Sequence, residues 1–196
     1  MSTNERTEFG TVRTKCGCAA CTANCECIPG YLIPDDLERM IPHEVYKDAE
    51  SLATWAREHL RASEGALIER QYTDGRRVRM RVGTLVPAHR EGLSCHWLND
   101  GRCEIHENAP FGCAFFDCNQ TKAAADALSS QGITAIMQAH AEQGPYSVLW
   151  RLLWEEGLQS PSLLVKREAL NARWEELRQQ ARRRRPPSPL RPRRHY

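Results

Sequence analysis

The spacing of hydrophobic and polar residues predicts a mostly helical chain. Within residues 48–62, Leu52, Ala56 and Leu60 recur on one helical face, as expected for an amphipathic helix. Ser160-Pro161 marks the start of the last predicted helix, and Gly144-Pro145 marks the end of an earlier one. Helices are predicted at the end of 28–40 and over 48–62, 121–143, 145–157 and 160–185.

Residues 65–83 follow a different pattern, which predicts a β-hairpin. Asp74-Gly75 is a strong turn signal at the centre of this stretch. On its second arm Val78, Met80 and Val82 alternate with arginines. The alternation predicts one covered face and one face in solvent.

These elements define the expected fold class and domain organisation. The fold class is mostly α with a small β-hairpin, in which irregular cysteine-rich metal-binding loops pack on helices. The predicted parts are a flexible N-terminus at 1–15, a cysteine-cluster metal-binding domain at 16–120, C-terminal helices packed on it at 121–181, and a disordered Arg/Pro-rich tail at 182–196.

Composition and charge predict a cytoplasmic protein with a basic tail. The 196 residues are 41% hydrophobic and 27% charged, as is ordinary for a soluble domain. No segment reaches the ~18 apolar residues of a membrane helix, and the N-terminus has no apolar signal region. We therefore expect no membrane association. The net charge is +2, but residues 181–196 hold seven arginines and no acid, which leaves −5 for the first 180 residues.

Nine cysteines are unusual in a reducing compartment, where disulfides are rare. Their odd number excludes complete disulfide pairing, and metal ligation is the favoured explanation. Thiolates are soft ligands that select zinc, copper(I) or iron–sulfur centres. The cysteines form a first group of Cys16, Cys18, Cys21, Cys25 and Cys27, and a second group of Cys95, Cys103, Cys113 and Cys118.

The spacing within each group narrows the chemistry only in part. Cys18 and Cys21 form a C-x2-C step, which lets two thiolates of one turn reach one metal. The second group has gaps of seven, nine and four residues, which suit an iron–sulfur cluster better than a zinc finger. His96 and His106 are weaker candidate ligands, and their roles stay open.

The stretch "CHWLNDGRCEIHENAPFGCAFFDC" at 95–118 resembles the second half of the YkgJ-like cysteine-cluster family, described as zinc- or iron-chelating. The similarity covers about residues 16–120 and implies a metal site built from both halves, with no implied substrate. Cys25-Glu26-Cys27 replaces the family's adjacent cysteines, and Cys16 is additional. The matching residues are Cys95, Trp97, Leu98, Cys103, Ile105, His106, Glu107, Pro110, Cys113 and Cys118.

We predict that thiols of both groups converge on a shared centre, a [4Fe–4S] cluster or zinc. Cys16 is the weakest candidate ligand. The predicted metal ligands are Cys18, Cys21, Cys25, Cys27, Cys95, Cys103, Cys113 and Cys118.

The favoured function is a metal-binding protein related to redox chemistry or electron transfer, acting with an unidentified redox or protein partner. One alternative is a metal-dependent enzyme, although the chain has no P-loop, no G-x-G-x-x-G, no H-E-x-x-H and no C-x3-C-x2-C motif. A second alternative is a structural zinc module whose basic tail binds nucleic acid. A solubilising tail is favoured over that role because no recognised nucleic-acid fold accompanies it.

Overall fold

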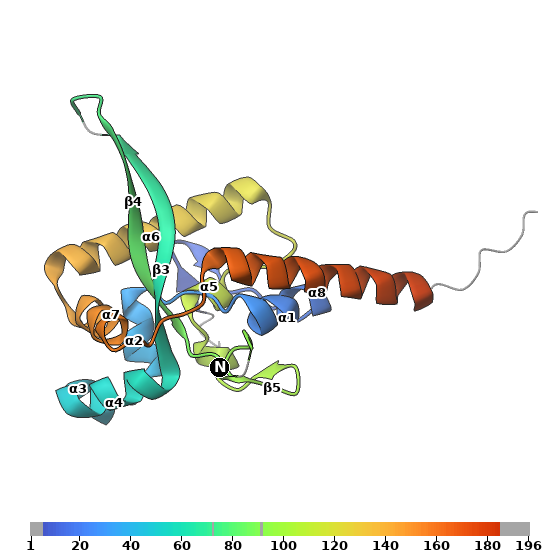
Figure 1. Cartoon of the computed structure of the whole chain (residues 1–196), viewed down its shortest axis with the longest axis horizontal. Coiled ribbons are helices and arrows are strands. Elements are labelled where there is room, and N and C mark those ends of the chain that lie inside the picture. The colour runs from blue at the N-terminus through green and yellow to red at the C-terminus, as the bar shows by residue number, and fades with distance from the viewer. Residues whose placement is uncertain (1–5, 72, 91, 185–196) are drawn as a thin grey trace, which may run out of the picture.

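The computed structural model describes residues 6–71, 73–90 and 92–184 (Figure 1). The helices lie around the inner end of one long hairpin, whose outer end projects beyond them, and the last helix, α8 (Leu163–Arg184), extends away from the body of the molecule. The elements in chain order are β1 (Thr7–Glu8), β2 (Thr11–Val12), α1 (Ala19–Cys27), α2 (Pro34–Met40), α3 (His43–Lys47), α4 (Ala49–His59), β3 (Leu60–Gln71), β4 (Arg77–Pro87), β5 (Leu98–Asn99), β6 (Arg102–Cys103), the 3-10 helix η1 (His106–Asn108), α5 (Phe111–Ala114), α6 (Lys122–Glu142), α7 (Pro145–Glu155) and α8 (Leu163–Arg184).

The predicted fold class, mostly α with small β-hairpins, is confirmed. Each predicted helix is present and the starts of three have a local cause, but the helix predicted over 48–62 ends at His59, because Leu60 begins β3. The Asp48 side chain caps α4 by accepting a 2.7 Å hydrogen bond from the Ser51 N–H. Thr121 caps α6 in the same way through the Ala124 N–H. Pro145 occupies the first turn of α7, where a missing N–H costs nothing.

Strands β3 and β4 form the predicted hairpin, with Gln71 opposite Arg77 at its outer end. The hairpin is longer than predicted, because a bulge between Ser63 and Ala66 lets pairing continue inward to Leu60. Gly65 in the bulge has φ +68°, and a Cβ there would lie 1.8 Å from the Val82 carbonyl oxygen. Only glycine therefore fits this turn of the strand.

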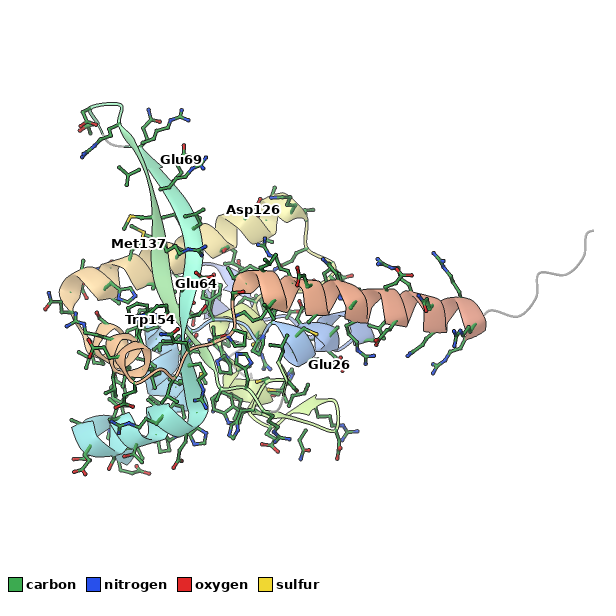
Figure 2. The ribbon with its side chains drawn as sticks, in the orientation of Figure 1. Glu26, Glu64, Glu69, Asp126, Met137 and Trp154 are labelled. Carbon is green, nitrogen blue, oxygen red and sulfur yellow. The ribbon has the colours of Figure 1, made fainter. Side chains whose placement is uncertain are left out.

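The outer part of the hairpin carries charged side chains and also exposes Leu67 and Met80, so the face predicted to be covered is buried only from Val82 inward, where the hairpin enters the core. Figure 2 shows Glu64 and Glu69 along β3, where they form ion pairs with Arg81 at 3.4 Å and Arg79 at 3.3 Å. These pairs lie on an exposed surface and contribute little to stability. Further inward, Leu85 is fully buried. The hairpin therefore anchors at one end only.

The core is fixed by Tyr146 of α7, one of the largest fully buried side chains. Its hydroxyl donates to the Leu32 carbonyl at 2.8 Å and accepts from the Leu85 N–H at 2.9 Å. A buried tyrosine with both hydrogen-bonding functions satisfied adds apolar burial without an unpaired polar group. Three separate segments, residues 31–33, β4 and α7, are joined at this one side chain.

Residues 6–15 differ from the loose segment expected at 1–15, because they form β1 and β2 and pack on the body. The Arg6 guanidinium pairs with the buried Asp36 carboxylate at 2.6 Å. The Thr14 N–H donates to the Ala114 carbonyl at 2.8 Å. These contacts depend on partners far along the chain, so local composition does not reveal them.

The first cysteine group also differs from the irregular backbone expected for it, since residues 19–27 form the helix α1. Helix α8 packs along it: Arg173 pairs with Glu26 at 2.5 Å, and the Trp174 indole N–H donates to the Ala20 carbonyl at 3.4 Å. Residues 182–184 of the predicted tail are the last residues of α8, and the remainder, 185–196, lies outside the described residues.

Candidate metal centres

Four thiols meet at one end of α1 in a group that we call the compact quartet, Cys16, Cys18, Cys21 and Cys118. All four sulfur atoms lie within 4.8 Å of one another. The separations are 3.5 Å between Cys18 and Cys118, 3.6 Å between Cys16 and Cys21, and 3.8 Å between Cys16 and Cys118. Cys18 caps α1 and Cys21 lies in its first turn, so the C-x2-C step brings two thiols to one point as predicted.

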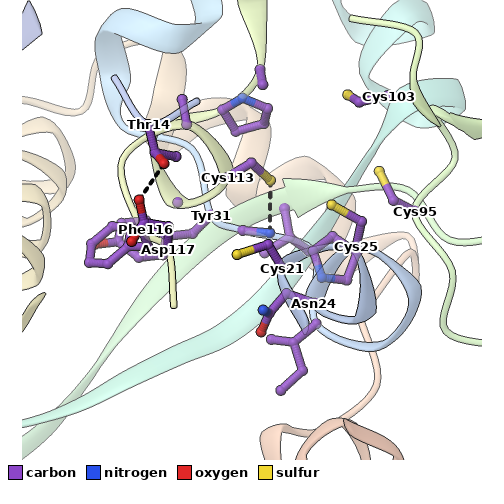
Figure 3. Close-up of a pocket in the computed structure, with 18 of the residues that line it drawn as sticks. Thr14, Cys21, Asn24, Cys25, Tyr31, Cys95, Cys103, Cys113, Phe116 and Asp117 are labelled. Carbon is purple, nitrogen blue, oxygen red and sulfur yellow. Dashed lines mark hydrogen bonds between the residues drawn. The ribbon is translucent and has the colours of Figure 1, made fainter. Parts of the chain in front are cut away.

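Hydrogen bonds around Asp117 bring Cys118 to the N-terminal segment. The Thr14 hydroxyl donates to the Asp117 carboxylate (Figure 3). The Cys16 N–H in turn donates to the Thr14 hydroxyl oxygen at 3.1 Å. The same carboxylate accepts the Asn119 N–H at 2.7 Å, which bends the chain just after Cys118. The hydroxyl of Thr14 lowers the pKa of Asp117, because a hydrogen bond favours the ionised carboxylate.

The spacing of the compact quartet fits a single tetrahedral ion. A Zn–S bond of about 2.3 Å in tetrahedral geometry places the sulfur atoms about 3.8 Å apart. The three separations of 3.5 to 3.8 Å agree with that value. The backbone N–H of Cys21, followed by the Cys118 side chain, lowers the pKa of Cys18 to about 7, whereas burial raises the pKa of Cys21 and the Cys18 side chain raises that of Cys118. Without a metal, Cys18 therefore ionises more readily than Cys21 or Cys118.

The remaining thiols of the second group gather with Cys25 in what we call the wide quartet, Cys25, Cys95, Cys103 and Cys113 (Figure 3). They come from four places in the chain: α1, the loop before β5, β6 and α5. The Cys95 N–H donates to the Cys25 carbonyl at 2.9 Å, which joins two of these segments directly. Among the residues that the structure describes, no three of these thiols meet within 4.8 Å.

Burial raises the pKa of every thiol in the wide quartet. The value is about 11 for Cys25 and about 12 for Cys95, and it also rises for Cys103 and Cys113. The negative charge of Cys103 raises the pKa of Cys25 further, and Cys25 acts in the same way on Cys95 and Cys113. The pKa values of Cys25, Cys95 and Cys113 are thus each raised by at least one other thiol of the quartet, whereas the charges that act on Cys103 are those of Arg13 and Glu104.

Two glycines let the backbone segments beside the wide quartet cross at close range. A Cβ on Gly30 would lie 2.1 Å from the Gly112 carbonyl carbon, and one on Gly112 would lie 2.4 Å from the Tyr31 nitrogen. At this crossing the Gly30 N–H points to the Cys113 sulfur at 3.1 Å (Figure 3). The glycines thus bring α5 against the end of α1 and set the position of Cys113.

Cys27, a predicted ligand, lies outside both quartets. It is buried against Ala23 and Leu170, where α8 covers α1. Cys27 follows Cys25 by two residues, which is about 200° around a helix of 3.6 residues per turn, so the two side chains face different ways. Cys16, the weakest candidate ligand from the sequence, lies beside the thiols of Cys18, Cys21 and Cys118 and replaces Cys27 among the eight cysteines of the two quartets.

Neither candidate histidine belongs to a group of ligand atoms within 4.8 Å in the described part of the chain. His96 instead lies against His59, with 3.1 Å between His96 Nε2 and His59 Nδ1. His59 in turn stacks on Trp97, with ring centroids 5.7 Å apart. His106 begins η1, and its carbonyl accepts from Arg13. The His96 ring therefore packs beside the loop that carries Cys95, whereas His106 is exposed and contributes its backbone carbonyl.

A cavity of about 1070 Å³ is lined by seven of the eight quartet thiols, all except Cys18. Its wall also includes Lys166 of α8, which is 1% exposed. The Lys166 ammonium donates to the Ser160 hydroxyl at 3.0 Å, and that hydroxyl lies 2.9 Å from His89 Nε2. Since the Leu93 carbonyl 2.9 Å from His89 Nδ1 can only accept, Nδ1 carries the proton and Nε2 accepts from Ser160.

Replacing Lys166 by methionine is expected to stabilise the protein most below pH 8. Burial lowers the pKa of Lys166 from 10.5 to about 8, an effect that Glu64 opposes. Between these two values the unfolded chain binds more protons than the folded chain, so wild-type stability rises with pH. The free energy of unfolding of Lys166→Met should therefore exceed that of wild type by a constant margin below about pH 8, and this margin should narrow between about pH 8 and pH 10.5. Urea denaturation at several pH values measures it, and a margin that stays constant across this second range contradicts the prediction.

No family model, no curated protein and no solved structure matches this chain. The similarity to the YkgJ-like family therefore stays a prediction. No helix among the described residues is long and apolar enough to cross a lipid bilayer. The case for function consequently depends on the geometry of the thiols.

Proposed function

We propose that this protein is a metalloprotein whose compact quartet binds one zinc ion as a structural centre. The observation that carries the proposal is the spacing of the four sulfur atoms, which all lie within 4.8 Å of one another. Four thiolates around a single ion form a closed tetrahedral site, the arrangement typical of structural zinc. A [4Fe–4S] cluster is less suited to this quartet, because each thiolate binds a different iron and the sulfur atoms must lie farther apart.

The location of the quartet supports a structural role. Cys16, Cys18 and Cys21 belong to the N-terminal segment and the start of α1, whereas Cys118 lies between α5 and α6. Cys18 and Cys118 are separated by 100 positions in the chain. An ion held by both parts fixes the path of residues 13–18 across the body, a stretch that has no helix or strand and no fully buried side chain to stabilise it.

Metal analysis of the purified protein tests the proposal. The wild-type chain, purified under reducing conditions, should contain one zinc per chain in the compact quartet. Replacing zinc by cobalt(II) should give the intense visible absorption of tetrahedral sulfur ligation. Cys118→Ala should lose this zinc, and Cys27→Ala should keep it because Cys27 lies outside the quartet.

Two results would overturn the proposal. One is a folded wild-type protein in which Cys18 and Cys118 form a disulfide and no zinc is present. The other is equal zinc content in Cys118→Ala and in wild type. Counting free thiols after alkylation in denaturant separates a disulfide from a metal site, since only the disulfide resists alkylation.

A further inference from the structure

The wide quartet differs from the compact quartet in spacing as well as in place. Its four thiols line one cavity, yet no three of them meet within 4.8 Å in the described part of the chain. A single tetrahedral ion would draw all four sulfur atoms to about 3.8 Å from one another. The wide quartet therefore suits a larger inorganic group, in which each thiolate binds a different metal atom.

We propose that Cys25, Cys95, Cys103 and Cys113 bind a [4Fe–4S] cluster, which makes the protein a two-centre metalloprotein. In such a cluster each thiolate binds a different iron, so the four ligands arrive singly from four directions. The four cysteines arrive in this manner, one each from α1, the loop before β5, β6 and α5. A [2Fe–2S] cluster would require two pairs of thiolates, each pair sharing one iron. This inference goes beyond the zinc centre and does not depend on it.

Full ligation decides what the cluster does. With four cysteines every iron has a protein ligand, and no iron is left open for a substrate. Cys25 lies on the same helix as the compact quartet's Cys21, but each of the two serves a separate quartet. A cluster of this kind transfers single electrons or supports the fold, and does not activate a substrate by direct binding. The alternative of an enzyme with an open iron is correspondingly less favoured.

The surroundings of the wide quartet suit a buried cluster. Trp97 is 7% exposed, and both Trp97 and Phe116 line the cavity beside the thiols. The Gly30 N–H that reaches the Cys113 sulfur at 3.1 Å is the type of hydrogen bond that tunes the reduction potential of iron–sulfur clusters. Because Gly30 can have no side chain at the crossing with Gly112, this donor can approach the sulfur closely.

Anaerobic reconstitution of the full chain with iron(II) and sulfide tests the inference. Wild type should bind about four iron and four sulfide per chain, and one-electron reduction by dithionite from the 2+ to the 1+ state should give a paramagnetic signal. Cys95→Ala should lose most of the iron and keep the zinc of the compact quartet. Cys118→Ala should keep the iron and lose the zinc, and Cys27→Ala should keep both.

The two metal readouts distinguish failure of this inference from failure of the zinc proposal. Retained zinc would also show that Cys95→Ala is folded. Even if that variant does not fold, the iron and sulfide content of the wild-type protein decides the cluster type. Two iron per chain, or a second zinc with no iron after reconstitution, would overturn the cluster assignment. Iron loss in Cys27→Ala as large as in Cys95→Ala would overturn the ligand set.

Discussion

Cys118→Ala is expected to lower the free energy of unfolding by about 4 to 5 kcal/mol, although Cys118 is exposed. This estimate treats the ion as a cross-link between positions 18 and 118, since a covalent link that closes a loop of about 100 residues contributes roughly 4.7 kcal/mol through the unfolded chain. Without metal ligation, an exposed cysteine would cost about 0.5 kcal/mol or less on truncation. Urea denaturation of protein with its zinc content measured beforehand checks the value.

Cys27→Ala is the matched control, because burial and metal ligation predict opposite orders. Cys27 is buried against Leu170, so its truncation should cost about 1 kcal/mol through lost packing. If burial alone governs stability, Cys27→Ala is the more destabilising change. If the compact quartet holds an ion, Cys118→Ala is more destabilising by several kcal/mol. The reverse order would count against the structural zinc centre.

Asp36→Ala is expected to destabilise the protein by about 3 to 5 kcal/mol, because it removes one partner of a buried ion pair. Asp36 is fully buried, and its carboxylate accepts the Ile33 N–H at 2.9 Å and the Phe111 N–H at 2.7 Å. It also pairs with Arg6 at 2.6 Å and Arg39 at 3.5 Å. Burial raises the pKa of Asp36, and these four donors oppose that rise.

The neighbouring Asp35→Ala supplies the comparison. Asp35 lies in the same first turn of α2, but its side chain is 70% exposed and reaches Arg39 only at 4.0 Å. Its loss should cost about 0.5 kcal/mol or less, as for other exposed ion pairs. Chemical denaturation of both variants measures the difference, and similar values for the two would show that Asp36 does not anchor these segments.

Periodicity was sufficient to predict the longer helices and the long hairpin, because both depend on neighbours close in sequence, but it did not predict α1, α3 or α5. The apolar spacing of residues 48–62 and the Asp74-Gly75 turn each describe a local structure, and both are present. The buried role of Asp36 could not be predicted in this way. An acid in the first turn of a helix is ordinary, and only the fold brings Arg6 and Phe111 to it.

The sequence also predicted that the cysteines gather, but not how they divide. The C-x2-C step of Cys18 and Cys21 is a local signal, and the structure places both thiols in the compact quartet. Whether Cys25 joins that group depends on the loops that carry Cys95 and Cys113, which are more than 65 positions away. Cys16 reaches the compact quartet through Thr14 and Asp117, a connection that cysteine spacing does not contain.

Helix α1 has a consequence for how the two centres are filled. Cys21 and Cys25 lie one turn apart on it, about 6 Å along its axis, and each serves a different quartet. Ordering this short helix costs conformational entropy once, so a metal centre that binds at one quartet also orders the helix that carries a ligand of the other quartet. If both proposed centres form, we expect them to be weakly coupled: a variant that loses one centre should keep the other, but should bind it with lower affinity than wild type does.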